Sequence, residues 1–107
     1  MSDLPKLVRD RVPAAIRRNG GECVSHECSD QRARAKFLDA KLLEEALELV
    51  EAPTHEAVLE ELTDVLTVLS AFAEFHGIGP SDVFEASRKK YRRFGGFDDW
   101  VILESVS

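Results

Sequence analysis

The pattern of apolar positions predicts two long amphipathic helices in the middle of the chain. The first begins after Ser29 or Asp30 and runs to about Glu51, and its apolar arc is formed by Leu38, Leu42, Ala46, Leu49 and Val50. The second covers residues 55–76, and its apolar face is formed by Val58, Leu62, Val65, Leu66, Leu69, Phe72 and Ala73. Between them, Pro53 stops one helix and Thr54 can cap the next, so we expect a helical hairpin.

Shorter helices are predicted on both sides of the hairpin. Pro13 suits the first turn of a helix that ends near Asn19, where two glycines follow. Ser29 or Asp30 can cap the first long helix. The sequence Gly-Ile-Gly-Pro at residues 77–80 ends the second long helix. Another helix is expected from Ser81 to about Arg93, with an apolar face that packs on the hairpin.

The two remaining segments are strand-like in part. Residues 99–104 are rich in β-formers, and residues 22–28 are short, mixed and flanked by turn formers. The two segments can pair as a small two-stranded β element, and an irregular loop is the alternative for residues 22–28.

The expected fold class is therefore mainly α, in a single domain of residues 1–107. Both long helices are apolar over arcs that are wider than one hairpin and one short helix can cover. A second subunit would complete a four-helix-bundle-type core, so we expect a homo-oligomer, either a dimer or a tetramer.

Two acidic signatures on the long helices carry the candidate chemistry. The first helix contains Glu44-Glu45-Ala-Leu-Glu48, and the second contains Glu61-Leu-Thr-Asp64. Residues three apart on a helix lie on neighbouring positions of one face, so Glu45 pairs with Glu48 and Glu61 with Asp64. These four acids fall at the margin of the apolar arcs, where they should be half buried, whereas Glu44, Glu51 and Glu60 are expected to project outward.

Four carboxylates at one apolar seam favour a bound cation. They would repel one another and resist desolvation without one. Oxygen ligands without histidine or thiolate suit magnesium or manganese, and magnesium commonly takes further ligands from a phosphorylated substrate. The alternative is an ordinary solvated helix face, where glutamates pair with basic residues. No Lys or Arg lies between Leu42 and Ser87, which favours the metal site.

The net charge and the hydropathy of the chain disfavour some classes of binding partner and some cellular locations. A formal net charge of -6 disfavours binding to nucleic acid polymers and anionic membranes, whose phosphates would be repelled. With neither a membrane span nor an apolar signal run, a cytoplasmic location is expected. Cys23, His26 and Cys28 match no common zinc spacing and lack a fourth ligand, so neither zinc nor a disulfide is expected there.

With both signatures in place, the chain resembles the MazG-like, all-alpha nucleoside triphosphate pyrophosphohydrolase superfamily, whose hallmark is E-E-x-x-E followed by E-x-x-D. This chain also resembles a small subgroup labelled phosphoribosyl-ATP pyrophosphohydrolase-like, in two further segments at residues 6–13 and 90–97. The resemblance implies cleavage of nucleoside triphosphates between the alpha and beta phosphates, to a monophosphate and pyrophosphate.

Carried across by position, the resemblance implies magnesium, or else manganese, bound by Glu45, Glu48, Glu61 and Asp64. Glu44 and Glu45 are the candidate catalytic acids, and the role of Glu44 stays open between metal ligand, support of a ligand and orientation of the attacking water. Phosphates that the metal does not neutralise need cationic donors, and the candidates are Lys90, Arg93, Lys41, Lys6 and Arg9. For Lys90 and Arg93, the alternative is that bases near a helix C-terminus only complement its dipole.

Two other functions stay open at this point. One is hydrolysis of phosphoribosyl-ATP in histidine biosynthesis, which the label of the subgroup suggests. The other is a helical dimerisation or regulatory module that kept the fold and lost turnover. The leading hypothesis is a magnesium-dependent pyrophosphohydrolase that removes unwanted or modified nucleoside triphosphates.

Overall fold

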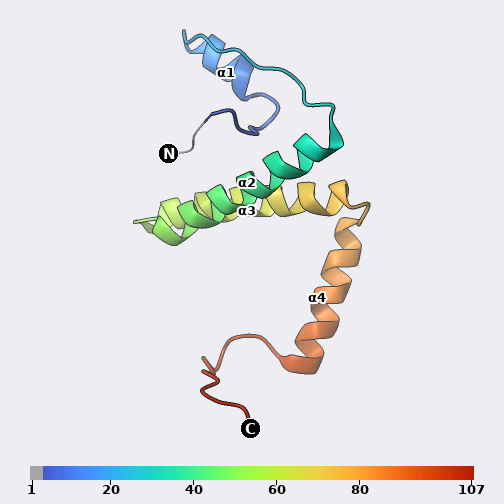
Figure 1. Ribbon diagram of the computed structural model, residues 1–107. Helices are drawn as coiled ribbons and strands as arrows, with labels where there is room; N and C mark the ends of the chain where they lie inside the picture. The colour runs from blue at the N-terminus through green and yellow to red at the C-terminus, as the bar shows by residue number, and fades with distance from the viewer. Residues whose placement is uncertain (1–3) are drawn as a thin grey trace. The chain divides into compact units, whose positions relative to one another are not determined.

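The computed structural model describes residues 4–107, and this part of the chain is all-α, with four helices and no strand (Figure 1). The helices are α1 (Val12–Arg18), α2 (Gln31–Glu51), α3 (His55–Phe75) and α4 (Pro80–Phe94). The chain divides into two compact units, one ending at Phe72 and the other beginning at Ala73. Each predicted helix is therefore confirmed, with ends that differ by a residue at most from those expected.

The ends of the hairpin helices follow from local side-chain chemistry. The Asp30 carboxylate accepts a hydrogen bond from the backbone N–H of Ala33 at 3.0 Å and so caps α2. The Thr54 hydroxyl accepts one from the N–H of Ala57 at 3.1 Å and caps α3. Such a cap contributes about 1 kcal/mol to helix stability. Because Pro53 lies between these helices, the chain reverses where the sequence predicts it to.

In the first unit, α2 and α3 lie side by side as an antiparallel hairpin (Figure 1). Carboxylate oxygens of Glu45 on α2 and of Glu61 and Asp64 on α3 lie within 4.8 Å of one another, so the two acidic signatures face each other. Among the described apolar residues, Leu38 and Val68 are the most buried, at 5% and 8% exposure. The acids thus lie beside a small core, but Val68 is not among the residues that the helical pattern places on the apolar face of α3.

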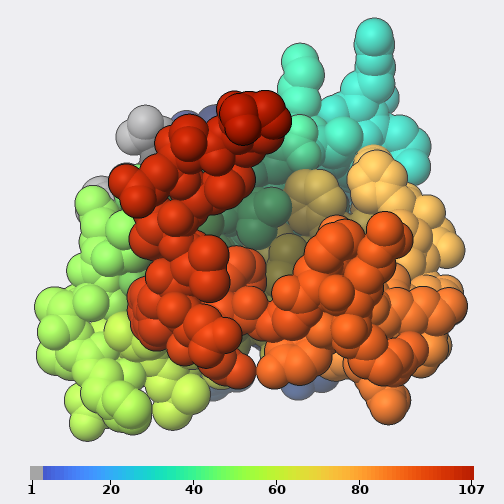
Figure 2. All heavy atoms as spheres, turned by 90° about the horizontal axis from the view of Figure 1, so that it is seen from below, coloured from blue at the N-terminus to red at the C-terminus, as the bar shows by residue number. Residues whose placement is uncertain are grey.

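Other faces of the hairpin carry exposed large apolar side chains. They are Leu43, Leu47, Val50, Leu59, Leu62, Leu66 and Leu69. The atoms around the turn between α2 and α3, green to lime in Figure 2, are open to view on the face seen there. Val50, Leu62, Leu66 and Leu69 were expected in the core, and a single copy of the first unit does not bury them.

The N-terminal segment and α1 complete the first unit. Pro13 lies in the first turn of α1, and Gly20, with φ of 88°, follows its end. Before α1, residues 6–9 have no regular secondary structure, and the Arg9 side chain reaches Asp64 on α3. This contact ties the start of the chain to the hairpin.

The predicted two-stranded β element is wrong for the described residues. Residues 22–28 are irregular, and their polar groups turn back to α1: Arg17 donates to the carbonyl of Cys23, and the Cys23 thiol to the carbonyl of Pro13. In residues 99–104, Trp100 has a positive φ of 52°, and its N–H bonds to the carbonyl of Phe97 in a turn. A strand needs an extended backbone and a ladder partner, and neither segment has both.

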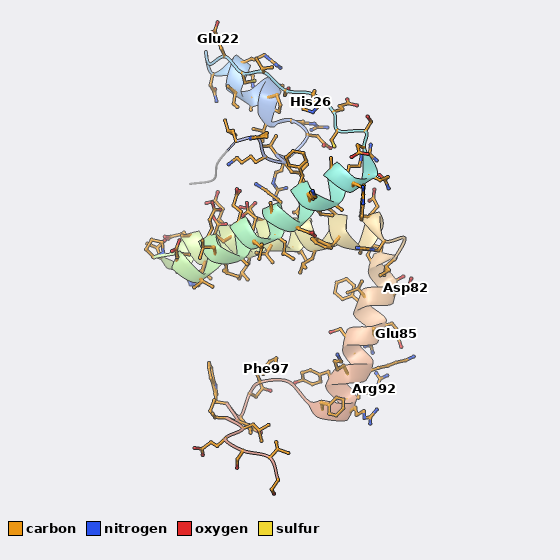
Figure 3. All side chains as sticks on the ribbon, viewed as in Figure 1. Glu22, His26, Asp82, Glu85, Arg92 and Phe97 are labelled. Carbon is orange, nitrogen blue, oxygen red and sulfur yellow. The ribbon has the colours of Figure 1, made fainter. Side chains whose placement is uncertain are left out.

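The second unit contains α4 and the segment that follows it. The backbone N–H of Gly79 donates to the Asp82 carboxylate at 3.3 Å at the start of α4, and Gly95, with φ of 80°, ends the helix. Figure 3 shows Asp82, Glu85 and Arg92 along α4 and Phe97 beyond it. That the apolar face of α4 packs on the hairpin stays a prediction.

No helix within residues 4–107 has the combination of length and apolar character that crossing a membrane requires.

Candidate metal centre

Five acids of α2 and α3 form two overlapping groups in the first unit. In one, oxygens of Glu44, Glu45 and Glu48 lie within 4.8 Å of one another, and in the other, so do oxygens of Glu45, Glu61 and Asp64. Glu45 belongs to both groups. Glu45 on α2 therefore lies close both to Glu48 on its own helix and to Glu61 and Asp64 on α3, which links the four acids predicted as ligands.

Two carboxylate oxygens in this cluster are buried without a hydrogen-bond donor. Glu45 is only 5% exposed, and its Oε1 lies 3.2 Å from the Lys41 ammonium. Its Oε2 has no donor among the described residues, and neither has Oε2 of Glu61. Buried carboxylate oxygens are almost always satisfied, because leaving one unpaired costs the desolvation of a charged group. A shared proton, an ordered water or a cation would satisfy these two oxygens.

The environment of Glu61 favours its protonated form. Burial, the hydrogen bond that a protonated Glu61 carboxyl makes with Glu45, and the negative charges of Glu48, Glu45 and Asp64 together raise the pKa of Glu61 from 4.5 to about 7. A divalent cation would have the opposite effect, because it stabilises the carboxylates that coordinate it. Proton and cation thus compete for the same oxygens.

The donor set fits a hard divalent cation. All the groups are carboxylates, and their oxygens are close enough for one ion to reach several. Two of these oxygens have no hydrogen-bond donor in the described part of the chain. Magnesium and manganese prefer such oxygen donors. No cysteine or histidine belongs to these groups in the part of the chain that the structure describes: Cys23 and Cys28 are free thiols, and His26 lies on the irregular segment after α1 (Figure 3).

Glu44 does not project outward as the helical wheel predicted. Its side chain is only 13% exposed, and it accepts a hydrogen bond from Lys41 at 2.8 Å. Lys6 lies 3.9 Å from its other oxygen. The wheel describes α2 alone, and the N-terminal segment covers this side of the helix. Glu51 and Glu60 are exposed, as expected.

Three of the predicted phosphate-binding cations contact the acids directly. Lys41 bonds Glu44 and Glu45, Lys6 approaches Glu44, and Arg9 reaches Asp64. Burial disfavours the Lys41 ammonium, but hydrogen bonds and charges from Glu44 and Glu45 together outweigh it and raise its pKa. The acids therefore do have basic partners, although two of the three come from the far N-terminal segment, which local sequence cannot reveal.

Charge balance is consistent with one divalent ion. With every group ionised, the five acids and the three cations leave two negative charges at the cluster.

The contact of Arg9 involves a residue that sequence reasoning missed. The guanidinium donates to Asp64 Oδ1 at 2.7 Å and to the Thr67 hydroxyl at 3.2 Å. Thr67 lies one turn after Asp64 on the same face of α3, and this spacing is the signal that could have identified it. Thr67 helps to hold Arg9 beside the acids.

A cavity of about 460 Å³ adjoins the cluster within the first unit. Its charged lining consists of Lys6, Arg9, Lys41, Glu45 and Asp64. The cavity therefore brings together three of the five candidate cations and two candidate metal ligands in a space that can admit a small molecule.

The two remaining candidates, Lys90 and Arg93, belong to the second unit. They lie in the last turns of α4, and the Arg93 guanidinium stands 4.9 Å from the centre of the Phe94 ring. Their role in binding substrate stays a prediction.

Comparison with known proteins agrees with this geometry. Residues 34–94, more than half of the chain, match the model of the MazG nucleotide pyrophosphohydrolase domain. An uncharacterized protein of Mycolicibacterium smegmatis is 47% identical over 57 residues, which cover 53% of this chain and 57% of that relative. The chain thus aligns with little more than half the length of this curated relative. No solved structure gives a significant match. The acidic signatures lie inside the matched region, and the chain belongs to the MazG nucleotide pyrophosphohydrolase domain family.

Proposed function

We propose that this protein is a magnesium-dependent nucleoside triphosphate pyrophosphohydrolase, which cleaves its substrate between the alpha and beta phosphates to a monophosphate and pyrophosphate. The observation that carries the proposal is the buried pair of carboxylate oxygens, Oε2 of Glu45 and of Glu61, which lie in a cluster of five acids and have no donor within residues 4–107. The family supports the same reading, since its members use a divalent metal and a nucleotide substrate. Removal of unwanted or modified triphosphates is the role that we propose.

The proposed ligands of the ion are Glu45, Glu48, Glu61 and Asp64. Glu45 is central, because it is shared between the two groups of converging oxygens. When bound, magnesium or manganese would neutralise phosphate charge and favour ionisation of a coordinated water. The hairpin holds the acids in place, because its helix caps and its small core fix the positions of α2 and α3.

Glu44 and Glu45 are the proposed catalytic acids. Lys41 holds both, at 2.8 Å from Glu44 and 3.2 Å from Glu45, so their orientations are coupled. We assign Glu44 the orientation of the attacking water, because its contacts with Lys41 and Lys6 fix its carboxylate at the edge of the cluster. A general base must lie within hydrogen-bond reach of the water from which it takes a proton.

The proposed phosphate ligands are Lys6, Arg9, Lys41, Lys90 and Arg93. Phosphoryl transfer depends mainly on charge neutralisation and alignment, which cations close to the reacting phosphates supply. Lys6, Arg9 and Lys41 already line the cavity beside the acids. Lys90 and Arg93 would have to reach the same phosphates from α4.

A homo-oligomer is proposed as the working form. The exposed leucines of the hairpin support it, because a water-soluble surface seldom leaves so many large apolar side chains together. A second copy of the hairpin would cover them in a four-helix bundle.

The test is the identity of the products. Purified protein with magnesium should release pyrophosphate and a monophosphate from nucleoside triphosphates, and Glu61→Gln should abolish this release. Glu60→Gln is the matched control, since Glu60 is the exposed neighbour on the same helix. Phosphoribosyl-ATP belongs in the panel: a strong preference for it would assign the histidine pathway instead. Absence of pyrophosphate from every substrate, with magnesium or manganese, would leave the silent helical module.

A further inference from the structure

The cavity beside the acids has a second kind of wall. Besides its charged residues, it is lined by apolar side chains of the N-terminal segment, α1 and α3: Leu4, Val8, Val12, Ile16 and Val68. Four of these five residues precede residue 34, where the match to the family begins. The apolar wall is therefore mostly a product of this chain's own N-terminal segment.

The charged and apolar parts belong to one continuous space. Glu45 and Asp64 line the cavity and belong to the acidic cluster, and the unpartnered Oε2 oxygen belongs to a Glu45 side chain that is more than nine-tenths buried. A cavity of about 460 Å³ lies in the range of pockets that bind small molecules, which usually combine apolar walls with a few polar groups. A ligand that spans both parts would carry negative charge at one end and apolar surface at the other.

We propose that this cavity is the subsite for the nucleoside part of the substrate, an inference that rests on the proposed function. The cleaved phosphates must lie at the acids, and the sugar and base are covalently joined to the alpha phosphate, so they must occupy space next to the acids. Val8 and Val12 then contact the sugar and base, while Lys6 and Arg9 of the same segment face the phosphates. The N-terminal segment thus supplies a wall of the substrate site.

The cavity offers few side chains that could read a base. Among the described residues of the lining, Thr67 has the one neutral hydrogen-bonding side chain, and its hydroxyl donates to the carbonyl of Thr63 at 3.0 Å and accepts from Arg9 at 3.2 Å. The nucleoside is therefore held by burial of its apolar surface against the wall.

Val8→Trp tests the subsite, because the larger ring would fill it. The matched control is Val24→Trp, since Val24 is fully exposed on the irregular segment after α1. Calorimetric titration with magnesium would compare a nonhydrolysable nucleoside triphosphate with inorganic pyrophosphate. Val8→Trp should weaken binding of the nucleotide by about tenfold or more and leave binding of pyrophosphate unchanged. Val24→Trp should bind both ligands as the wild type does.

A measurement on the wild type removes any dependence on how the variant folds. In methyl NMR spectra, the nonhydrolysable nucleotide should shift the signals of Leu4, Val8 and Val12 beyond the shifts that pyrophosphate causes, and Val24 should not move. The subsite proposal is overturned if the nucleotide and pyrophosphate shift these methyls equally, or if Val8→Trp binds the nucleotide as tightly as the wild type does. If the wild type still releases pyrophosphate from triphosphates, the proposed function stands even though the subsite does not. A wild type that neither binds the nucleotide nor releases pyrophosphate would overturn both.

Discussion

Arg9 and Asp64, 55 positions apart in the sequence, are joined by a 2.7 Å ion pair between a guanidinium nitrogen and Oδ1 of the carboxylate. The pair fastens the N-terminal segment to α3 at a candidate metal ligand. It also places a positive charge where a divalent ion would bind. Arg9 therefore has an observed role as the ion-pair partner of Asp64 and a proposed role as a ligand of a phosphate.

Replacement of Arg9 should separate these two roles. The side chains are 54% and 29% exposed, so the pair contributes at most about 1 kcal/mol to the free energy of unfolding. Arg9→Gln should lower the melting temperature only slightly, increase the affinity for a divalent ion alone by no more than about fivefold, and raise KM for the nucleotide. Arg11→Gln, an exposed neighbour, is the control. If the two variants gave the same KM and ion affinity, Arg9 would have no part in the site.

The pKa of Glu61 predicts how stability depends on pH. The folded protein keeps a proton on Glu61 up to about pH 7, whereas the unfolded chain loses it near 4.5. The free energy of unfolding should therefore decrease as pH rises through this window, with the full loss reached above pH 7. Glu61→Gln cannot titrate and should lack this part of the slope.

Thermal melts without metal from about pH 4.5 to 8 check this, with Glu60→Gln as the control. Because a bound ion requires the ionised carboxylate, magnesium should stabilise the wild type more as pH rises toward 7. Parallel melting curves for the wild type and Glu61→Gln would disprove the raised pKa.

Much of the fold is predictable from sequence because it is decided locally. Asp30, Pro53 and Thr54 set the ends of the hairpin helices through their own side chains, and the structure uses each as expected. Helical spacing predicts that Glu45 pairs with Glu48 and Glu61 with Asp64, and the short turn brings Glu45 to Glu61 and Asp64.

The features that sequence reasoning missed depend on contacts between distant segments. Glu44 lies inward because Lys6, 38 positions before it, approaches from the N-terminal segment. The same segment brings Arg9 to Thr67. The prediction of a β element is wrong for a related reason: the short, mixed sequence around Cys23 does not show that its polar groups bond to α1.

The exposed leucines predict the response of the assembly to mutation. Leu66 is 61% exposed, and with Leu59, Leu62 and Leu69 it forms a stripe on α3 away from the acids. Leu66→Glu should dissociate the proposed homo-oligomer, since a buried unpaired charge strongly destabilises an interface. Val24→Glu makes a comparable change at an exposed site outside the hairpin. Light scattering coupled to gel filtration would report the mass; a monomeric wild type, or an unchanged Leu66→Glu oligomer, would contradict the prediction.

The apolar wall of the cavity predicts weak selection among bases. Since the Thr67 hydroxyl already donates to Thr63 and accepts from Arg9, we expect discrimination to come mainly from shape and burial. Such pockets separate related ligands by about 10- to 200-fold, whereas hydrogen-bonding pockets reach about 10⁴-fold or more. We expect kcat/KM values for the common nucleoside triphosphates to differ by less than about 200-fold. A preference near 10⁴-fold for one base would contradict this prediction, because it would require hydrogen bonds to the base that the lining side chains do not provide.

The central claim is that the cluster around Glu45 binds a divalent cation, and a manganese titration followed by electron paramagnetic resonance measures this directly. The comparison needs the wild type, Glu48→Gln and Glu51→Gln, because Glu48 lies in the cluster and Glu51 is the exposed glutamate one turn later on α2. We predict that the wild type and Glu51→Gln bind manganese alike and that Glu48→Gln binds at least about tenfold more weakly. A wild type that leaves all manganese free, or a Glu48→Gln variant that binds it as tightly as the wild type, would contradict the account.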